Sequence, residues 1–174
     1  KEILICDRNG VISKVRRDLT PHKKTLLKFS NKNNFSGTLS ETLSGADIFI
    51  GVSQGNLITA ADVRKMNKDA IIFALANPIP EIMPDEARKG GARVVASGRS
   101  DFPNQINNVL AYPSIFKGVL EARAPQITER MKLAAALALA SVIKTPTAEK
   151  IIPDPFDKRV VPAVSNAVKK IARR

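Results

Sequence analysis

Short apolar runs that alternate with helical stretches constrain the fold of this chain more than any other feature. We expect strands where a run is rich in β-branched or other apolar residues and ends at a turn signal. Such runs lie at Glu2–Cys6, Asp47–Val52, Ala70–Ala76 and Arg93–Ala96. After their first residues they are apolar rather than alternately apolar and polar, which indicates a sheet covered by helices on both faces. Strands that alternate with helices predict right-handed βαβ units and a doubly wound parallel sheet of the α/β class.

Capping residues mark the expected helices between and after these strands. Thr20-Pro21 predicts the N-cap and first residue of a helix that runs to about Phe29. After about Ile115 the strand pattern stops, so we expect the C-terminal part to be helical. The further helices are predicted over residues 38–44, 59–67, 84–89, 129–143 and 159–172.

Two strand ends offer candidate ligand groups, because open parallel sheets bind ligands outside the carboxyl ends of their strands. One expected strand ends at Gly51-Val52-Ser53 and the next at Asn77-Pro78. Small and amide side chains at these points suit a nucleotide. Asparagine before proline also forms turns in any protein, so this pattern alone leaves Asn77 open between a ligand contact and a turn.

Asp7 follows the apolar run ILIC directly and precedes Arg8-Asn9-Gly10. In a Rossmann-type domain a G-x-G-x-x-G turn holds the pyrophosphate, and an acidic residue about 20 residues later binds the adenosine ribose. The chain contains no G-x-G-x-x-G. We therefore expect it to begin at the second strand of such a sheet, without the first βα unit. An Asp-x-x-Gly sequence is also an ordinary turn, and Asp7 taken alone does not decide between the two.

The segment SGRSDFPNQINNVLAYP, residues 97–113, concentrates carboxamides: Asn104, Gln105, Asn107 and Asn108. Carboxamides donate and accept hydrogen bonds without adding charge, which suits a dicarboxylate held beside a metal. The alternative is an Asn-rich turn that caps the following helix, and composition alone favours it.

The net charge of +12 is concentrated at the two ends of the chain. Residues 1–34 carry nine Lys and Arg against three Asp and Glu, and residues 156–174 carry six against one. A solvated basic surface is the simplest interpretation, followed by attraction of anionic small molecules and then of nucleic acid. One Tyr and no Trp argue against a base-stacking platform.

The location expected for this chain is the cytoplasm. Its longest apolar run, Leu133–Ile143, is far shorter than the roughly 20 residues that span a bilayer, and we recognise no signal sequence. The single cysteine, Cys6, lies within an apolar run and is expected to be a small buried residue rather than a nucleophile. His22 is expected on the surface.

Five stretches resemble the malic enzyme family, and its smaller bacterial-type members in particular. They run in the family's order and cover nearly the whole chain: ILICDRNGVI, GTLSETLSGADIFIGVS, IIFALANPIPEIMPDEA, ASGRSDFPNQINNVLAYPSIFKGVLEARA and IIPDPFDKRVVPAVSNAV. The resemblance implies that residues 1–174 form the NAD(P)-binding domain, a Rossmann-like sheet, incomplete at its N-terminus, with C-terminal helices. It also implies an upstream domain that holds the metal and the catalytic groups.

The resemblance implies oxidative decarboxylation of L-malate to pyruvate and CO₂, with reduction of NAD or NADP and a requirement for Mn²⁺ or Mg²⁺. Carried over to the matching positions, it implies that Asn77 and Asn108 bind malate. It implies a cofactor site made of Asp7, Arg8, Val52, Ser53, Asn77 and Asn107. The family's Lys and Tyr for proton transfer and its three metal-binding carboxylates lie upstream in the family's order, so no catalytic or metal-binding residue is assigned in this chain.

The resemblance further implies that the N-terminal half of the same enzyme is a partner, and that the enzyme is a homo-oligomer assembled through that half, with no membrane or nucleic-acid partner. Cofactor preference stays open: Asp7 favours NAD, whereas Arg8 and its basic neighbours could neutralise the 2′-phosphate of NADP, and we lean to NAD. Two alternatives remain. One is a nucleotide- or nucleic-acid-binding module that uses the basic terminal segments, and the other is a different dehydrogenase, which does not explain ANP followed by QINN.

Overall fold

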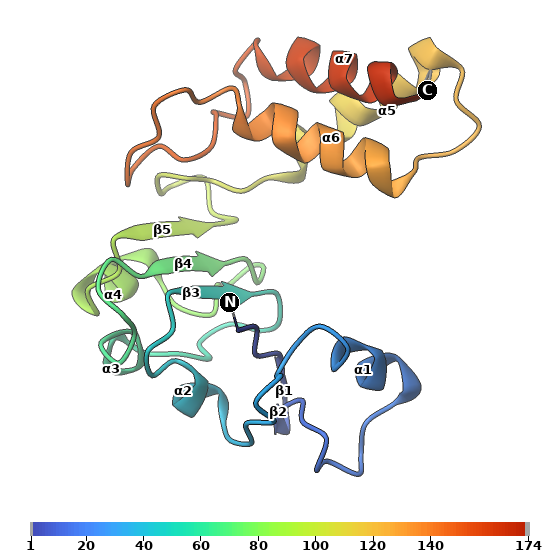
Figure 1. Ribbon diagram of the computed structural model, residues 1–174. Coiled ribbons are helices and arrows are strands. Elements are labelled where there is room, and N and C mark those ends of the chain that lie inside the picture. The colour runs from blue at the N-terminus through green and yellow to red at the C-terminus, as the bar shows by residue number, and fades with distance from the viewer. Residues whose placement is uncertain (1, 173–174) are drawn as a thin grey trace.

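The computed structural model describes residues 2–172 and shows an α/β fold built around a three-stranded parallel sheet. The strands lie in the order β3 (Ile48–Gly51), β4 (Ile71–Ala74) and β5 (Val94–Ser97), as Figure 1 shows. These three strands confirm the predicted runs: β3 and β4 are shorter than predicted, and β5 is shifted by one residue. The connections carry α3 (Ala60–Val63) and α4 (Pro84–Lys89), so the strands and helices alternate as the pattern predicted.

The N-terminal run does not join this sheet, and the prediction of a strand over Glu2–Cys6 is wrong. Instead, β1 (Cys6–Asp7) pairs antiparallel with β2 (Gly10–Val11) around a tight turn. A strand needs a neighbour for its backbone N–H and C=O groups. The carbonyl of Ile3 accepts from the N–H of Asn31 at 2.7 Å, and that of Ile5 from the N–H of Ile12 at 2.8 Å, so loop contacts take the place of a sheet neighbour.

The sheet core lies on one face. Phe49, Ile72 and Val95 are paired across the three strands and are buried against side chains of the helical connections. The opposite face is open at β3, where Ile48 is 53% and Ile50 is 61% exposed. Among residues 2–172, this part of the sheet therefore lacks the helical cover that its apolar sequence predicted.

Capping residues begin the short helices where the sequence predicted them. The Thr20 hydroxyl accepts a hydrogen bond from the N–H of Lys23 at the start of α1 (Pro21–Leu26). Thr38 and Thr59 form capping boxes at the starts of α2 (Leu39–Thr42) and α3. All three helices end earlier than predicted, because the local caps fix their starts while packing decides their ends.

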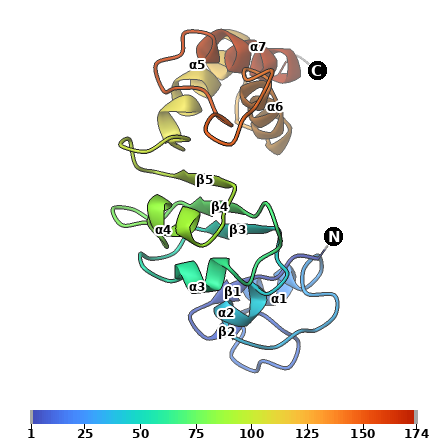
Figure 2. The ribbon, with the colours of Figure 1, turned by 90° about the vertical axis from the view of Figure 1, so that its left-hand side faces the viewer.

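The C-terminal part forms a helical layer beyond β5, which Figure 2 shows from the side. The short 3₁₀-helix η1 (Asn108–Leu110) precedes α5 (Tyr112–Ala122), α6 (Glu129–Ala140) and α7 (Val160–Ala172). Their buried side chains make a second hydrophobic core, separate from that of the sheet. Within the described residues no helix is long and apolar enough to cross a membrane.

Asn104 connects the sheet to the loop that precedes α7. This residue is buried and adopts a left-handed backbone conformation with φ of 58°. Its Nδ2 donates to the carbonyls of Val95 at 3.1 Å and Ala148 at 2.8 Å, and its Oδ1 accepts from the N–H of Ile151 at 2.9 Å. The carboxamide of Asn104 is therefore structural, and only the other amides of this segment remain candidates for a ligand.

Candidate functional site

The loops that follow β3, β4 and β5 meet at the carboxyl edge of the sheet. Val52 and Ser53 follow β3 and are exposed, with Val52 78% exposed, and the exposed Asn77 follows β4. A Cβ placed on Gly98, which follows β5, would lie 4.0 Å from Asn77 Nδ2. The structure thus places three of the predicted site residues at one edge with their side chains open to a ligand.

The third loop returns along this edge towards the predicted malate site. Gln105 forms an isolated parallel β-bridge with Ser97, the last residue of β5. The N–H of Ile106 donates to the Ser97 carbonyl at 2.8 Å. Asn107 is the N-cap of η1, and its Oδ1 accepts from the N–H of Val109 at 3.1 Å. Asn108 begins η1 with an exposed side chain. Asn107 is therefore partly a capping residue, as the alternative interpretation held, whereas Asn108 has its carboxamide available.

Glu81 was not singled out from the sequence, yet its carboxylate lies beneath this edge. The side chain is fully buried, and its oxygens accept from the N–H of Ser53 at 2.8 Å and of Ala76 at 3.0 Å. A signal existed in the sequence, since Glu81 is a lone charge inside the apolar stretch IPEIM. Buried carboxylates are rare unless they are paired or hydrogen-bonded, and this one binds the ends of two parallel strands.

Asp7 lies at the turn between β1 and β2 in a cluster of charged groups. Its Oδ1 accepts from Arg16 Nη1 at 2.8 Å and from the N–H of Asn9 at 2.9 Å. Its Oδ2 accepts from Arg16 Nη2 at 3.1 Å and from Lys23 Nζ. The hydrogen bonds from Arg16, followed by that from Lys23, hold the pKa of the Asp7 carboxyl well below its ordinary value.

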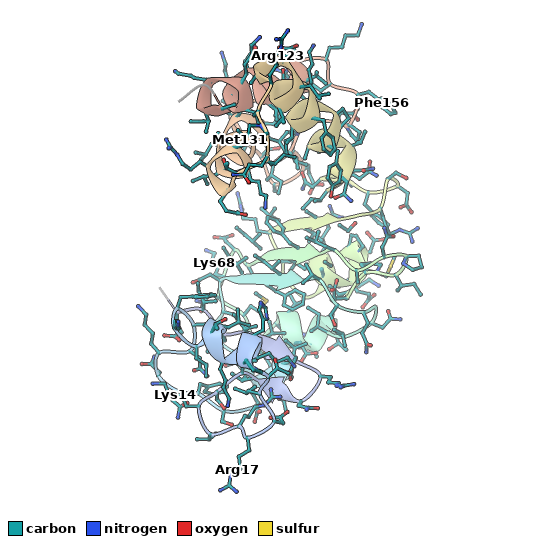
Figure 3. All side chains as sticks on the ribbon, turned by 90° about the vertical axis from the view of Figure 1, so that its right-hand side faces the viewer. Lys14, Arg17, Lys68, Arg123, Met131 and Phe156 are labelled. Carbon is teal, nitrogen blue, oxygen red and sulfur yellow. The ribbon has the colours of Figure 1, made fainter. Side chains whose placement is uncertain are left out.

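These contacts occupy the carboxylate that was predicted to bind ribose. An ionised carboxylate offers about four acceptor positions, and four donors already use them. A ribose hydroxyl would have to replace one donor, and Lys23 is the more accessible, with its side chain 35% exposed against 11% for Arg16. Arg8 is exposed beside this cluster, and Figure 3 shows Arg17 reaching away from the body of the molecule.

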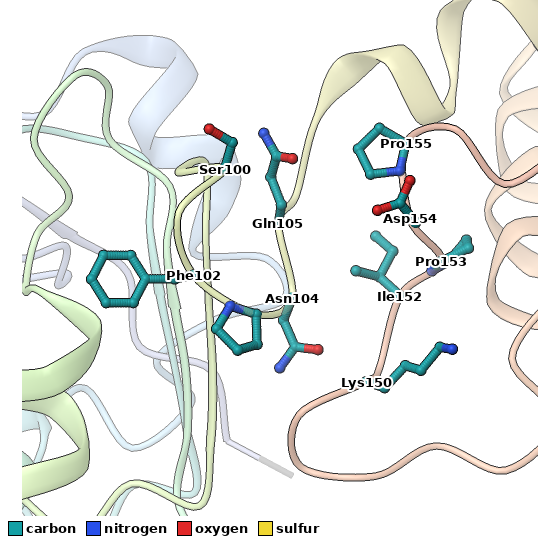
Figure 4. A pocket seen from close by; sticks show the side chains of 10 residues that line it. Ser100, Phe102, Asn104, Gln105, Lys150, Ile152, Pro153, Asp154 and Pro155 are labelled. Atoms are coloured by element: carbon teal, nitrogen blue, oxygen red, sulfur yellow. The ribbon is translucent and has the colours of Figure 1, made fainter.

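A cleft of about 290 Å³ lies between the loop 100–105 and the loop 150–155, as Figure 4 shows. Lys150 and Asp154 line one side of it and Gln105 the other. Asn77, Asn107 and Asn108 are not among its lining residues, so this cleft is distinct from the predicted malate site. Its lining combines one cation, one carboxylate and three uncharged polar side chains with proline and other apolar groups, and this mixture does not indicate a ligand class.

The described residues offer neither a cluster of metal ligands nor an activated cysteine nucleophile. Within residues 2–172, the His, Cys, Asp and Glu side chains form no group of three or more that could hold a metal ion. These residues alone therefore do not fit the divalent metal that the resemblance implies. Cys6 is half-buried, and burial raises the pKa of its thiol, which disfavours the reactive thiolate. His22 is exposed, as predicted.

Comparisons with known proteins match the chain from end to end. The family model described as "Malic enzyme, NAD binding domain" matches residues 1–173. A bifunctional malic/malolactic enzyme of Bacillus subtilis (strain 168) is 50% identical over 99% of this chain and 43% of that protein. An NADP-dependent malic enzyme of Rhizobium meliloti (strain 1021) is 42% identical over 99% of this chain and 24% of that protein.

The fold also matches that of a solved malic enzyme structure. The crystal structure of an NAD-dependent malic enzyme from Thermotoga maritima superposes with a TM-score of 0.92 and 44% sequence identity. The superposition covers 97% of this chain and 45% of that one. The chain thus spans less than half the length of each of these three relatives, and none of the three names refers to nucleic acid.

Proposed function

Because this chain belongs to the malic enzyme family, as its NAD-binding domain, we propose that it forms the wall of the active site that binds nicotinamide dinucleotide and L-malate. The whole enzyme converts malate to pyruvate and CO₂. This proposal rests on one observation. Three exposed residues, Val52, Ser53 and Asn77, lie together at the carboxyl edge of the sheet. This edge is where open parallel sheets bind their ligands.

The bound dinucleotide supplies the acceptor for the hydride that leaves C2 of malate. The residues of this chain bind and orient. Asn77 and Asn108 present exposed carboxamides that donate hydrogen bonds to the malate carboxylates without adding charge. In this arrangement Val52 and Ser53 face the dinucleotide after the end of β3, and Asn107, next to Asn108, faces its nicotinamide. Proton transfer belongs to other parts of the enzyme.

The direct test of this function is the reaction of the intact enzyme. Malate should drive reduction of NAD or NADP with equal amounts of pyruvate and CO₂ formed. Asn108→Ala should lose a malate contact worth about 1–3 kcal/mol, which is roughly a 5- to 150-fold fall in kcat/KM for malate. The exposed Asn166 on α7 provides the matched control, and Asn166→Ala should leave kcat/KM unchanged. An unchanged value in Asn108→Ala would remove Asn108 from the site.

We further propose that Asp7 and Arg8 face the adenosine ribose and that NAD is the preferred cofactor. The support is the position of the Asp7 carboxylate at the end of β1, with a releasable donor in Lys23. The ratio of kcat/KM for the two cofactors measures this preference in the intact enzyme. A tenfold preference for NADP would contradict it.

We also propose what the rest of the enzyme supplies. The first βα unit and the domain that binds Mn²⁺ or Mg²⁺ belong to another part of the polypeptide, and the exposed apolar face at Ile48 and Ile50 suits cover by such a unit. That part mediates assembly into a homo-oligomer in the cytoplasm. Removing the metal with a chelator should abolish malate oxidation, and binding of the dinucleotide should persist, since the described residues hold no metal cluster.

A further inference from the structure

We propose that Glu81 is a positioning residue that fixes the two loops on which dinucleotide and malate bind. This inference rests on the proposed function, because it concerns how the same site is held in place. Glu81 touches neither ligand in the arrangement proposed. It acts through Ser53, which lies two residues after the end of β3 and faces the cofactor in the proposed arrangement, and through Ala76, which precedes the malate-binding Asn77.

Glu81 contacts the two loops through its side chain and through its backbone carbonyl. Its Oε1 accepts from the N–H of Ser53 at 2.8 Å, and its Oε2 accepts from the N–H of Ala76 at 3.0 Å. Its backbone carbonyl accepts from the N–H of Leu57 at 2.8 Å. Both strand ends have left the ladder of the sheet at these positions, so their amide groups depend on this carboxylate. The backbone also joins these segments, through the N–H of Asn56 to the Pro80 carbonyl at 3.0 Å and the N–H of Ile58 to the Glu81 carbonyl at 3.2 Å. The Glu81 side chain adds the contacts that hold the two strand ends themselves.

The burial and charge of Glu81 indicate that this arrangement is costly to replace. A fully buried carboxylate is stable only where hydrogen bonds compensate its loss of water. Both of its oxygens are acceptors, whereas a carboxamide offers one oxygen and an NH₂ group. Glutamine at this position would therefore turn a donor towards one of the two backbone N–H groups and leave that group unpaired.

Gly51 at the end of β3 makes the room that the carboxylate needs. A Cβ on Gly51 would lie 2.4 Å from Glu81 Cδ and 2.6 Å from its Oε1. Since no Cβ approaches other atoms so closely, any larger residue at position 51 must displace the carboxyl group. Gly51→Ala therefore moves the carboxylate while keeping its charge, and Glu81→Gln removes the charge while keeping the size.

Both variants of the intact enzyme should raise the Kd of the dinucleotide and the KM for malate by about tenfold, because an error of about 1 Å in positioning can cost up to 10²-fold. Fluorescence titration with NADH gives the Kd. Val168→Ala, in the separate core of the C-terminal helices, is the control for simple loss of stability. It should lower the melting temperature and leave both constants within about twofold, as expected for a distant site.

The outcomes separate the two proposals. If the wild-type enzyme binds dinucleotide and Glu81→Gln and Gly51→Ala bind it equally well, the positioning role is wrong and the proposed function stands. If the wild type binds no dinucleotide, the proposed function fails and this inference fails with it.

Hydrogen exchange of the wild type provides a measurement that needs no variant to fold. The amide of Ser53 should be protected although its side chain is exposed, and that of Gln54 should exchange fast. Equal exchange rates at the two positions would overturn the contact between Glu81 and the β3 loop.

Discussion

Replacement of Lys23 by alanine tests the proposed ribose site most sharply. The Lys23 ammonium contacts Asp7 Oδ2, and Arg16 donates to both oxygens of the same carboxylate. Lys23→Ala removes one of the four donors and leaves Arg16 to hold the carboxylate in place. The variant therefore frees one acceptor position without releasing Asp7 from its turn.

The size of the effect follows from the exposure of the pair. A partly exposed ion pair contributes about 0–1 kcal/mol, so its removal should tighten NAD binding by no more than about fivefold. NADP responds in the opposite direction. Its 2′-phosphate loses a nearby ammonium and faces a less compensated carboxylate, and like charges about 4 Å apart repel by about 1–4 kcal/mol. The preference for NAD over NADP should rise by about tenfold or more.

The assay is kcat/KM for both cofactors, measured on the wild type, on Lys23→Ala and on a control. Lys24→Ala removes the neighbouring lysine of α1, which is exposed and has no ion pair among the described residues. The control should leave the cofactor ratio unchanged. The same ratio in Lys23→Ala and the wild type, or the same shift in both variants, would refute the placement of Asp7 at the ribose.

Three further predictions concern the scaffold. Gly118→Ala on α5 places a Cβ 2.6 Å from the Ser165 carbonyl of α7; overpacking of about 1–3 kcal/mol should exceed the roughly 1 kcal/mol gained in helix propensity, and an unchanged or higher melting temperature would contradict this packing. Asn104→Ala removes three hydrogen bonds and should lower the free energy of unfolding in urea by about 3 kcal/mol, whereas a loss below about 1 kcal/mol would contradict the structural role. Folding lowers the pKa of Asp7, so the stability that its ion pairs contribute is complete above the unfolded pKa of about 3.9 and is lost as the pH falls below it. Asp7→Asn should therefore flatten the dependence of the melting temperature on pH below about 4. Equal slopes for the wild type and the variant would contradict the ion pairs.

Local signals explain which parts of the fold were predictable. The helix start at Thr59 was predicted because a capping box satisfies backbone groups within three residues. The three parallel strands were predicted from their apolar runs. The run Glu2–Cys6 has the same local character, but a strand also needs a neighbour in space, and the described chain supplies loop contacts there instead. Sequence patterns do not show whether that neighbour is present.

The same distinction holds for the site. Val52, Ser53 and Asn77 were found because strand ends in a parallel sheet share one edge. The contact of Glu81 with Ser53 joins residues 28 positions apart, and that of Asp7 with Lys23 joins residues 16 apart. Such contacts depend on the folded arrangement, so neither the buried carboxylate nor the filled acceptor positions of Asp7 followed from the sequence.

The central claim is that this chain supplies the wall that binds dinucleotide and malate. Its most direct test is a crystal structure of the intact enzyme with NAD and malate bound. We predict that the dinucleotide lies along the carboxyl edge of the sheet against Val52 and Ser53, with a malate carboxylate within hydrogen-bond distance of Asn77 and Asn108. A dinucleotide bound away from this edge, or malate without contact to either asparagine, would contradict the claim.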